Sequence, residues 1–132
     1  MDITQVEFYE KIFAQLVQLH KEIGELSKKK PDDPINIFKI KFINEKLGEA
    51  NRFLQGKHKP FSSFEVFEEA SLPTNSDVVF ILSQYIECLE GFRSENVEYS
   101  KYNWYWKTSG RGSKILTQKP TKFVREKDTY SS

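Results

Sequence analysis

Apolar residues in the first thirty positions recur every three or four residues, which is the spacing of one face of an α-helix. This face consists of Val6, Tyr9, Phe13, Leu16, His20 and Ile23, with Ile12, Leu19 and Leu26 beside it. Thr4 and Glu7 have the spacing of a capping box, and Pro31 cannot continue a helix. The pattern therefore predicts a helix from about Thr4 to Lys29.

A second apolar face lies between residues that typically begin and end helices. Asp33 followed by Pro34 is typical of a helix start, and Gly56 can end a helix in the left-handed conformation. The face between them consists of Ile43, Leu47, Ala50 and Leu54. We predict a helix from Asp33–Pro34 to about Gln55, although the partial alternation over 35–42 also suits a strand.

The most apolar segment of the chain follows a connector at residues 57–75. Within the connector, Ser62 and Glu65 predict a short helix over Ser63–Ala70, and residues 72–75 have the composition of a turn. The apolar face that follows comprises Val78, Leu82, Tyr85, Leu89 and Phe92. We predict a third helix from about Ser76–Asp77, and its wide apolar stripe indicates a central position.

The C-terminal third changes to the periodicity of a strand. Tyr102, Trp104 and Trp106 occupy every second position, and aromatic residues favour strands. A turn rich in glycine and serine follows, and residues 115–117 are predicted to return as a second strand. A β-hairpin is the preferred prediction, and the alternative is that the third helix extends through Tyr99 and Tyr102.

These patterns together predict a mainly α protein, a small bundle of three to four helices with a C-terminal β-hairpin. A length of 132 residues suits one domain. We expect a single helical domain over 1–118, hairpin included, and a flexible tail over 119–132. The predicted common core consists of Phe13, Leu16, Leu47, Leu82, Tyr85 and Leu89.

Charge is unevenly distributed, although the net charge is only +1. Residues 1–59 carry eleven basic and nine acidic groups. Residues 60–100 carry one basic and eight acidic groups, whereas residues 101–132 carry eight basic and two acidic groups. One interpretation is that the basic tail folds onto the acidic third helix or that both are solvated, which adds little stability. The other is that a charged face meets a partner of opposite sign.

Cellular location is indicated by cysteine usage and by hydrophobic run length. Cys88 is the only cysteine, so the chain cannot form the internal disulfides of small secreted domains. The first residues lack a signal-peptide pattern, and the longest apolar run, Val78 to Leu82, is far shorter than the roughly 20 residues of a membrane span. We expect a cytoplasmic protein without a membrane partner.

Residues able to support catalysis are few and scattered. A metal site needs several convergent ligands, whereas His20 and His58 are far apart and Cys88 has no cysteine partner. Glu87 and Glu90 flank Cys88, and their negative charge disfavours a thiolate nucleophile. We therefore expect no enzyme activity, no cofactor and no metal.

One pair of residues resembles a known catalytic motif. Arg52 and His58 are separated by five residues, which is similar to the Arg-x(4–6)-His motif of HEPN-type ribonucleases, a helical family of comparable size. The resemblance implies a metal-independent nuclease with these two residues at its site. Because two residues carry it, this is the third hypothesis for function.

The strongest functional signal is a C-terminal mixture of aromatic and basic side chains. The candidate partner-binding residues are Tyr102, Trp104, Tyr105, Trp106, Lys107, Arg111 and Lys114. Because Trp, Tyr and Arg dominate interface hot spots, we predict a non-enzymatic protein-binding module, such as an adaptor, an immunity- or antitoxin-like inhibitor or an assembly subunit. The alternative is a single-stranded nucleic-acid-binding protein, in which rings stack on bases and cations neutralise phosphates. This surface could also serve self-association. The remaining alternative is that the tryptophans have no binding role and complete the domain's own core.

Overall fold

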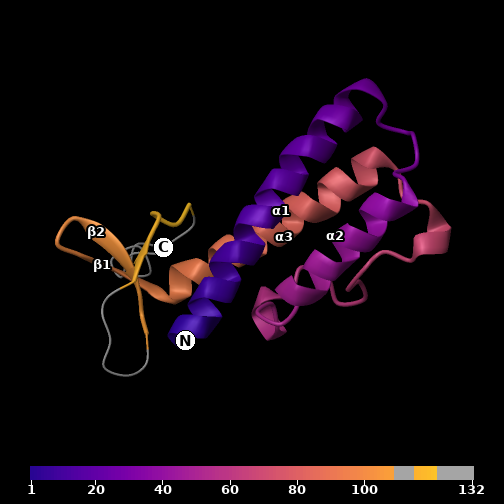
Figure 1. Ribbon diagram of the computed structural model, residues 1–132. Helices are drawn as coiled ribbons and strands as arrows, with labels where there is room; N and C mark the ends of the chain where they lie inside the picture. The colour runs from indigo at the N-terminus through magenta and orange to yellow at the C-terminus, as the bar shows by residue number, and fades with distance from the viewer. Residues whose placement is uncertain (109–114, 122–132) are drawn as a thin grey trace, which may run out of the picture.

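Three long helices and a small C-terminal sheet form the computed structural model, which describes residues 1–108 and 115–121 (Figure 1). The helices are α1 (Ile3–Lys29), α2 (Ile37–Ala50) and α3 (Asn75–Glu95), with the 3-10 turns η1 (Gly56–His58) and η2 (Glu69–Ser71) in the connector. The strands are β1 (Val97–Ser100), β2 (Asn103–Trp106) and β3 (Leu116–Thr117). The predicted class, a helical bundle with a C-terminal hairpin, is confirmed.

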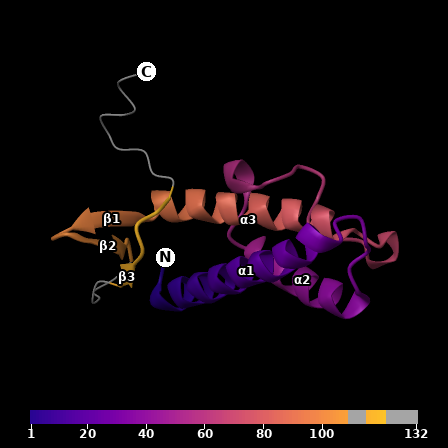
Figure 2. The same cartoon turned by 90° about the horizontal axis from the view of Figure 1, so that it is seen from above.

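The sheet lies at one end of the helical bundle. α1 and α3 pack along each other, and α2 joins them on one side (Figures 1 and 2). The strands follow the order β1-β2-β3, and every neighbouring pair is antiparallel. In both views the β1–β2 hairpin projects past the end of the bundle that holds the N-terminus of α1.

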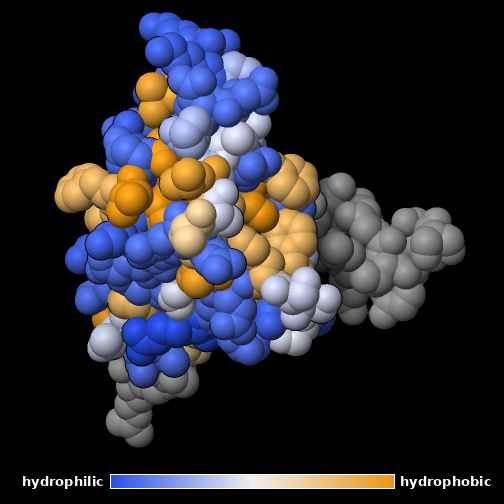
Figure 3. All heavy atoms as spheres, turned by 90° about the vertical axis from the view of Figure 1, so that its right-hand side faces the viewer, coloured by the Kyte–Doolittle hydropathy of each residue, from blue (hydrophilic) through white to orange (hydrophobic). Residues whose placement is uncertain are grey.

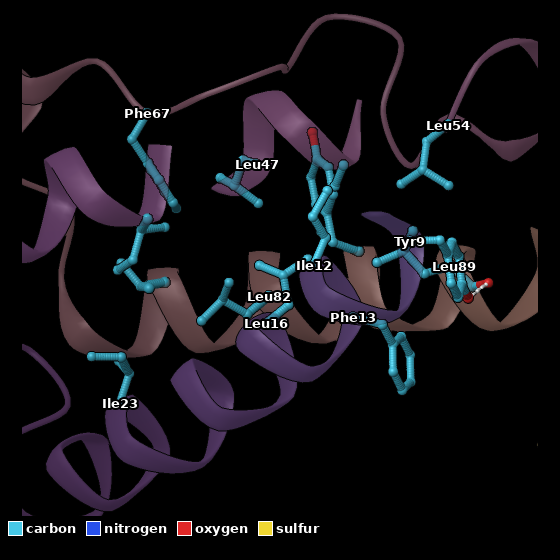
Figure 4. Close-up of a cluster of buried hydrophobic side chains, with 14 of the residues drawn as sticks. Tyr9, Ile12, Phe13, Leu16, Ile23, Leu47, Leu54, Phe67, Leu82 and Leu89 are labelled. Carbon is cyan, nitrogen blue, oxygen red and sulfur yellow. Dashed lines mark hydrogen bonds between the residues drawn. The ribbon is translucent and has the colours of Figure 1, made fainter. Parts of the chain in front are cut away.

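The core lies where the three helices meet, and all six predicted core residues are buried in it. Figure 4 shows side chains of α1, α2 and α3 converging, with Phe67 of the connector beside them. Tyr9 spans from α1 to α3, where its hydroxyl donates a hydrogen bond to the carbonyl of Leu89. The six residues that helical periodicity assigned to the core are therefore confirmed, and the core also includes Ile35, Phe67 and Trp106, which lie outside the predicted helical faces.

The start of α1 differs from the prediction. The capping box is formed by Asp2 and Gln5, not by Thr4 and Glu7: Asp2 Oδ1 accepts from the Gln5 amide at 2.8 Å, and Gln5 Oε1 accepts from the Asp2 amide at 2.9 Å. Both pairs have side chains that can cap a helix. The earlier pair prevails because it adds helical backbone hydrogen bonds ahead of Thr4.

The predicted bounds of the second helix were wrong at both ends. Its N-cap is Asn36, because the backbone of Asp33 and Pro34 pairs instead with the segment before α3. The Asn75 amide donates to the Asp33 carbonyl at 2.9 Å, and the Ile35 amide donates to Pro73 at 2.9 Å. At the other end the helix stops at Ala50, and Gly56, with φ of +58°, begins η1 instead of capping α2.

The predicted helix over Ser63–Ala70 is also absent, because side chains of the bundle hold this backbone in place. Asn44 makes two hydrogen bonds of 2.8 Å with the amide and carbonyl of Phe67. The Glu65 carbonyl accepts from Asn51 at 2.9 Å and from the Tyr85 hydroxyl at 3.1 Å. These long-range bonds replace the local bonds of a helix and bring Phe67 to the core.

The predicted pairing of residues 102–106 with 115–117 is confirmed, but the sheet holds one more strand. Trp104 pairs with Thr117 and Tyr105 with Leu116. β1, which was not predicted, pairs with β2 along its whole length. Because α3 ends at Glu95, the alternative of a longer third helix is wrong.

Leu82 gives a direct test of the core. It is fully buried, so Leu82→Ala should lower the free energy of unfolding by about 2–5 kcal/mol, as a cavity replaces packed atoms. Glu25→Ala is the matched surface change, because Glu25 forms an exposed ion pair with Lys28, and it should cost under about 1 kcal/mol. Denaturant titration followed by circular dichroism measures both, and equal losses would contradict this core assignment.

Candidate functional site

The β1–β2 hairpin has one aromatic face that continues from the core to the exterior. Val97 pairs with Trp106, and Tyr99 pairs with Trp104, so these four side chains share a face of the sheet. The pair nearest the helices, Val97 and Trp106, is buried, whereas Tyr99 is exposed and Trp104 is half-buried. The inner half of the hairpin, Val97 and Trp106, thus completes the core, whereas the outer half, Tyr99 and Trp104 with the turn, is only partly covered, with Trp104 packed against the edge of the core.

Trp106 belongs to the core and not to a binding surface. Only 2% of the residue is exposed, its indole packs edge-on against the Tyr9 ring at 4.9 Å, and its Nε1 donates to Glu10 Oε1 at 2.8 Å. A partner cannot touch it without opening the fold, so its assignment as a contact residue is corrected. The interpretation that a tryptophan completes the core applies to Trp106.

A buried arginine lies under the inner half of the hairpin. Arg93 of α3 is 0% exposed, and its guanidinium contacts Glu90 at 2.8 Å and Glu10 of α1 at 3.3 Å. The guanidinium also lies over the rings of Phe13, at 4.4 Å, and Tyr9, at 5.3 Å. A buried charge must be paired to be tolerated, so this cluster fixes α1 against α3.

The two glutamates of this cluster also hold the strands and the chain that follows them. Glu10 Oε1 accepts from Trp106 of β2 and from Thr117 Oγ1 of β3, both at 2.8 Å. Glu90 Oε2 accepts from the backbone amide of Thr121 at 3.0 Å, next to the buried Pro120. The attached chain therefore extends past the predicted boundary at 118, and residues 122–132 lie outside the described part.

Of the other predicted site residues, Tyr102 and Trp104 lie in the outer half of the hairpin, whereas Lys107 follows β2 at its inner end. Tyr102 is 91% exposed, and the Trp104 ring contacts that of Tyr99 at 5.3 Å. Tyr105 is half-buried on the opposite face of β2, and Lys107 is exposed. Arg111 and Lys114 lie outside the described residues. Tyr99 and Lys101, which belong to the same aromatic and basic segment of the sequence but not to the predicted set of contact residues, also lie in the outer half.

The turn at the tip of this hairpin is strained. Lys101 and Tyr102 form the two-residue loop between Ser100 and Asn103, and both have positive φ, of 48° and 69°. Positive φ at both positions is the signature of a type I′ turn, which normally uses Asn and Gly. A bulky aromatic residue there costs free energy, and such strain tends to occur at functional sites.

The residues considered for catalysis do not all line the same depression of the described surface. Arg52 lies over the Phe8 ring at 4.9 Å in a depression at the start of α1, whereas His58 lines a different depression with Cys88. His58 Nε2 contacts Glu95 Oε2 at 2.9 Å. The pKa of Glu95 is lowered, chiefly by its hydrogen bond with Lys57. Arg52 and His58, the pair of the ribonuclease motif, thus line different depressions.

The described residues define a class of protein only by fold: a three-helix bundle that carries a three-stranded C-terminal sheet. No protein-family model matches the chain, and neither a curated protein nor a solved structure matches it at a significant level. Within residues 1–108 and 115–121, no three His, Cys, Asp or Glu side chains are grouped to hold a metal ion. Over the same ranges no helix has the length and apolar character needed to span a membrane.

The Arg93 cluster can be tested by removing its charge. Arg93→Met leaves the buried Glu90 carboxylate without its partner and should cost about 3–5 kcal/mol of unfolding free energy. Adding Glu90→Gln should recover much of this loss, since the unpaired charge is removed as well. Urea titration followed by tryptophan fluorescence reports the result, with Lys28→Met as the exposed control. An unchanged midpoint in Arg93→Met would contradict the role given to this cluster.

Proposed function

We propose that this protein is a non-enzymatic protein-binding module whose contact surface is the outer half of the β1–β2 hairpin. The observation that carries the proposal is the aromatic face that runs out of the core and ends at a strained, exposed tyrosine. Tyr99, Tyr102 and Trp104 are exposed or half-buried there, although the inner half of the same face is fully packed. An adaptor or an inhibitor would use a surface of this kind.

The chemistry of the hairpin specifies a kind of partner. Tyrosine and tryptophan bring a large contact area with few rotatable bonds, which is why they dominate interface hot spots. The exposed Lys101 and Lys107 lie at the turn and at the end of β2. We infer a partner with a hollow that accepts Tyr102 and an acidic rim that meets the two lysines.

The anchoring of the hairpin supports a binding role. Its inner half is fixed to α1 through Glu10 and to α3 through the Arg93 cluster. A surface that is already ordered loses little conformational entropy when a partner binds, so more of the contact energy appears as affinity.

Single-stranded nucleic acid is the second candidate ligand, because exposed rings and lysines occur together on this hairpin. One contact weighs against it: the Tyr99 and Trp104 rings lie 5.3 Å apart at an interplanar angle of 51°, so part of their stacking surface already faces a neighbouring ring. Acidic side chains, among them Glu98 of β1, also lie on or near the hairpin.

Affinity purification with and without nuclease, followed by binding assays on the recovered partner, tests the proposal. Trp104→Ala and Tyr102→Ala should each weaken binding at least about tenfold, mainly through faster dissociation. Phe80→Ser is the matched control, because Phe80 is 55% exposed on α3 and away from the hairpin. Full affinity in both hairpin variants would reject the proposal. Loss of binding on nuclease treatment, with affinity falling steeply as salt rises, would indicate nucleic acid instead.

The strained turn allows stability and binding to be separated. Tyr102→Gly should raise the free energy of unfolding by about 1 kcal/mol, because glycine accepts positive φ, yet it should weaken partner binding. Lys101→Asn is the companion variant: it relieves strain at the neighbouring position and keeps the aromatic ring. Thermal melts and binding titrations measure the two effects. A destabilised Tyr102→Gly protein would show that the tyrosine serves the fold.

A further inference from the structure

An apolar groove lies between α1 and α2, far along the bundle from the hairpin. It has a volume of about 240 Å³ and is lined by Leu19, Glu22, Ile23, Phe38, Lys39 and Phe42. On the side of the molecule formed by α2 and the connector, apolar residues interrupt the hydrophilic surface (Figure 3). Phe38, which forms one wall of the groove, is 82% exposed, and Ile37 beside it is exposed as well.

The fold itself does not require these exposed rings. α2 contributes its buried residues Ile40, Ile43 and Leu47 to the core. Phe38 and Phe42 are four residues apart and therefore form a second row on the neighbouring face of the helix. Covering a side chain as exposed as Phe38 removes a large apolar area from water, so this face is suited to an interface.

The two walls of the groove carry opposite charges. Glu22 lies on the α1 wall and Lys39 on the α2 wall. Within the described residues neither side chain makes an ion pair, and the Glu22 carboxylate accepts only from the Gln18 amide, with 3.0 Å between Oε1 and Nε2. A partner that complements this groove must therefore present a basic group to one wall and an acidic group to the other.

We propose that the groove is a homodimer interface, occupied by α2 of a second copy of this chain. In a two-fold arrangement residue i meets residue j and j meets i, so each Lys39 faces the Glu22 of the other copy, and each Phe38 enters the other groove. An acidic or a basic peptide would satisfy one wall and leave the other unpaired. This proposal is independent of the function proposed for the hairpin.

The size of the groove sets the expected strength of the dimer. The apolar area around Phe38 is small beside the roughly 800 Å² per partner of standard stable interfaces. Dimerisation is therefore expected at micromolar or higher concentration, with rapid exchange. The Lys39–Glu22 contacts would set orientation, whereas the buried rings would supply affinity.

Sedimentation velocity of the full chain, from micromolar to millimolar concentration, tests the proposal. The expected result is a reversible monomer–dimer equilibrium. Phe38→Glu should weaken dimerisation at least about tenfold while leaving the melting temperature nearly unchanged, because the ring is exposed in the monomer. Phe80→Glu, a similar change on another exposed ring, should leave the dimer intact. A monomer at every concentration would overturn the proposal, and so would a dimer whose dissociation constant is unchanged by Phe38→Glu.

A charge exchange identifies the two-fold contact itself. Glu22→Lys and Lys39→Glu should each weaken the dimer, since each places like charges in two symmetric contacts. The double variant restores opposite charges in both contacts and should recover the dimer. Failure of this recovery would overturn the assigned geometry. A dimer lost in Tyr102→Ser but kept in Phe38→Glu would place self-association on the hairpin and also overturn it.

Discussion

The buried guanidinium of Arg93 is the constraint on which the C-terminal half of this structure depends. A fully buried charge must have its partners in place, and here they come from two helices: Glu90 of α3 and Glu10 of α1. Because Glu10 also accepts hydrogen bonds from Trp106 and Thr117, one carboxylate couples the helical bundle to two strands. The orientation of the hairpin is therefore determined by an electrostatic requirement as well as by packing.

This anchoring explains how a short hairpin can carry a strained turn. The free energy lost at Lys101 and Tyr102, both at positive φ, is offset by packing and hydrogen bonds in the inner half of the sheet. The outer half presents the exposed rings of Tyr99 and Tyr102 and the half-buried ring of Trp104. A dimer formed through the α1–α2 groove would carry two such hairpins, and a partner with two matching sites would be bound with avidity.

The periodicity of apolar residues predicted the three helices, the helical residues at the centre of the core and the pairing of β2 with β3. These features follow from local spacing, because residues three or four apart share a helix face and residues two apart share a strand face. Leu82 and Tyr85 are core residues for this reason. The alternation of aromatic residues predicted a hairpin in the same way. It did not predict β1, because a strand of four residues, two of them polar, has a weak pattern.

Only the tertiary structure decided where the elements end and which aromatic residues remain outside. Asp33 and Pro34 look like a helix start, but their backbone pairs with the segment before α3, so α2 begins later. Trp104 and Trp106 have the same strand periodicity, yet Trp106 is buried against Tyr9 and Glu10 of α1, whereas Trp104 lies at the edge of the core and is only half-buried. Sequence spacing assigns residues to a face, whereas burial depends on what the rest of the chain places against that face.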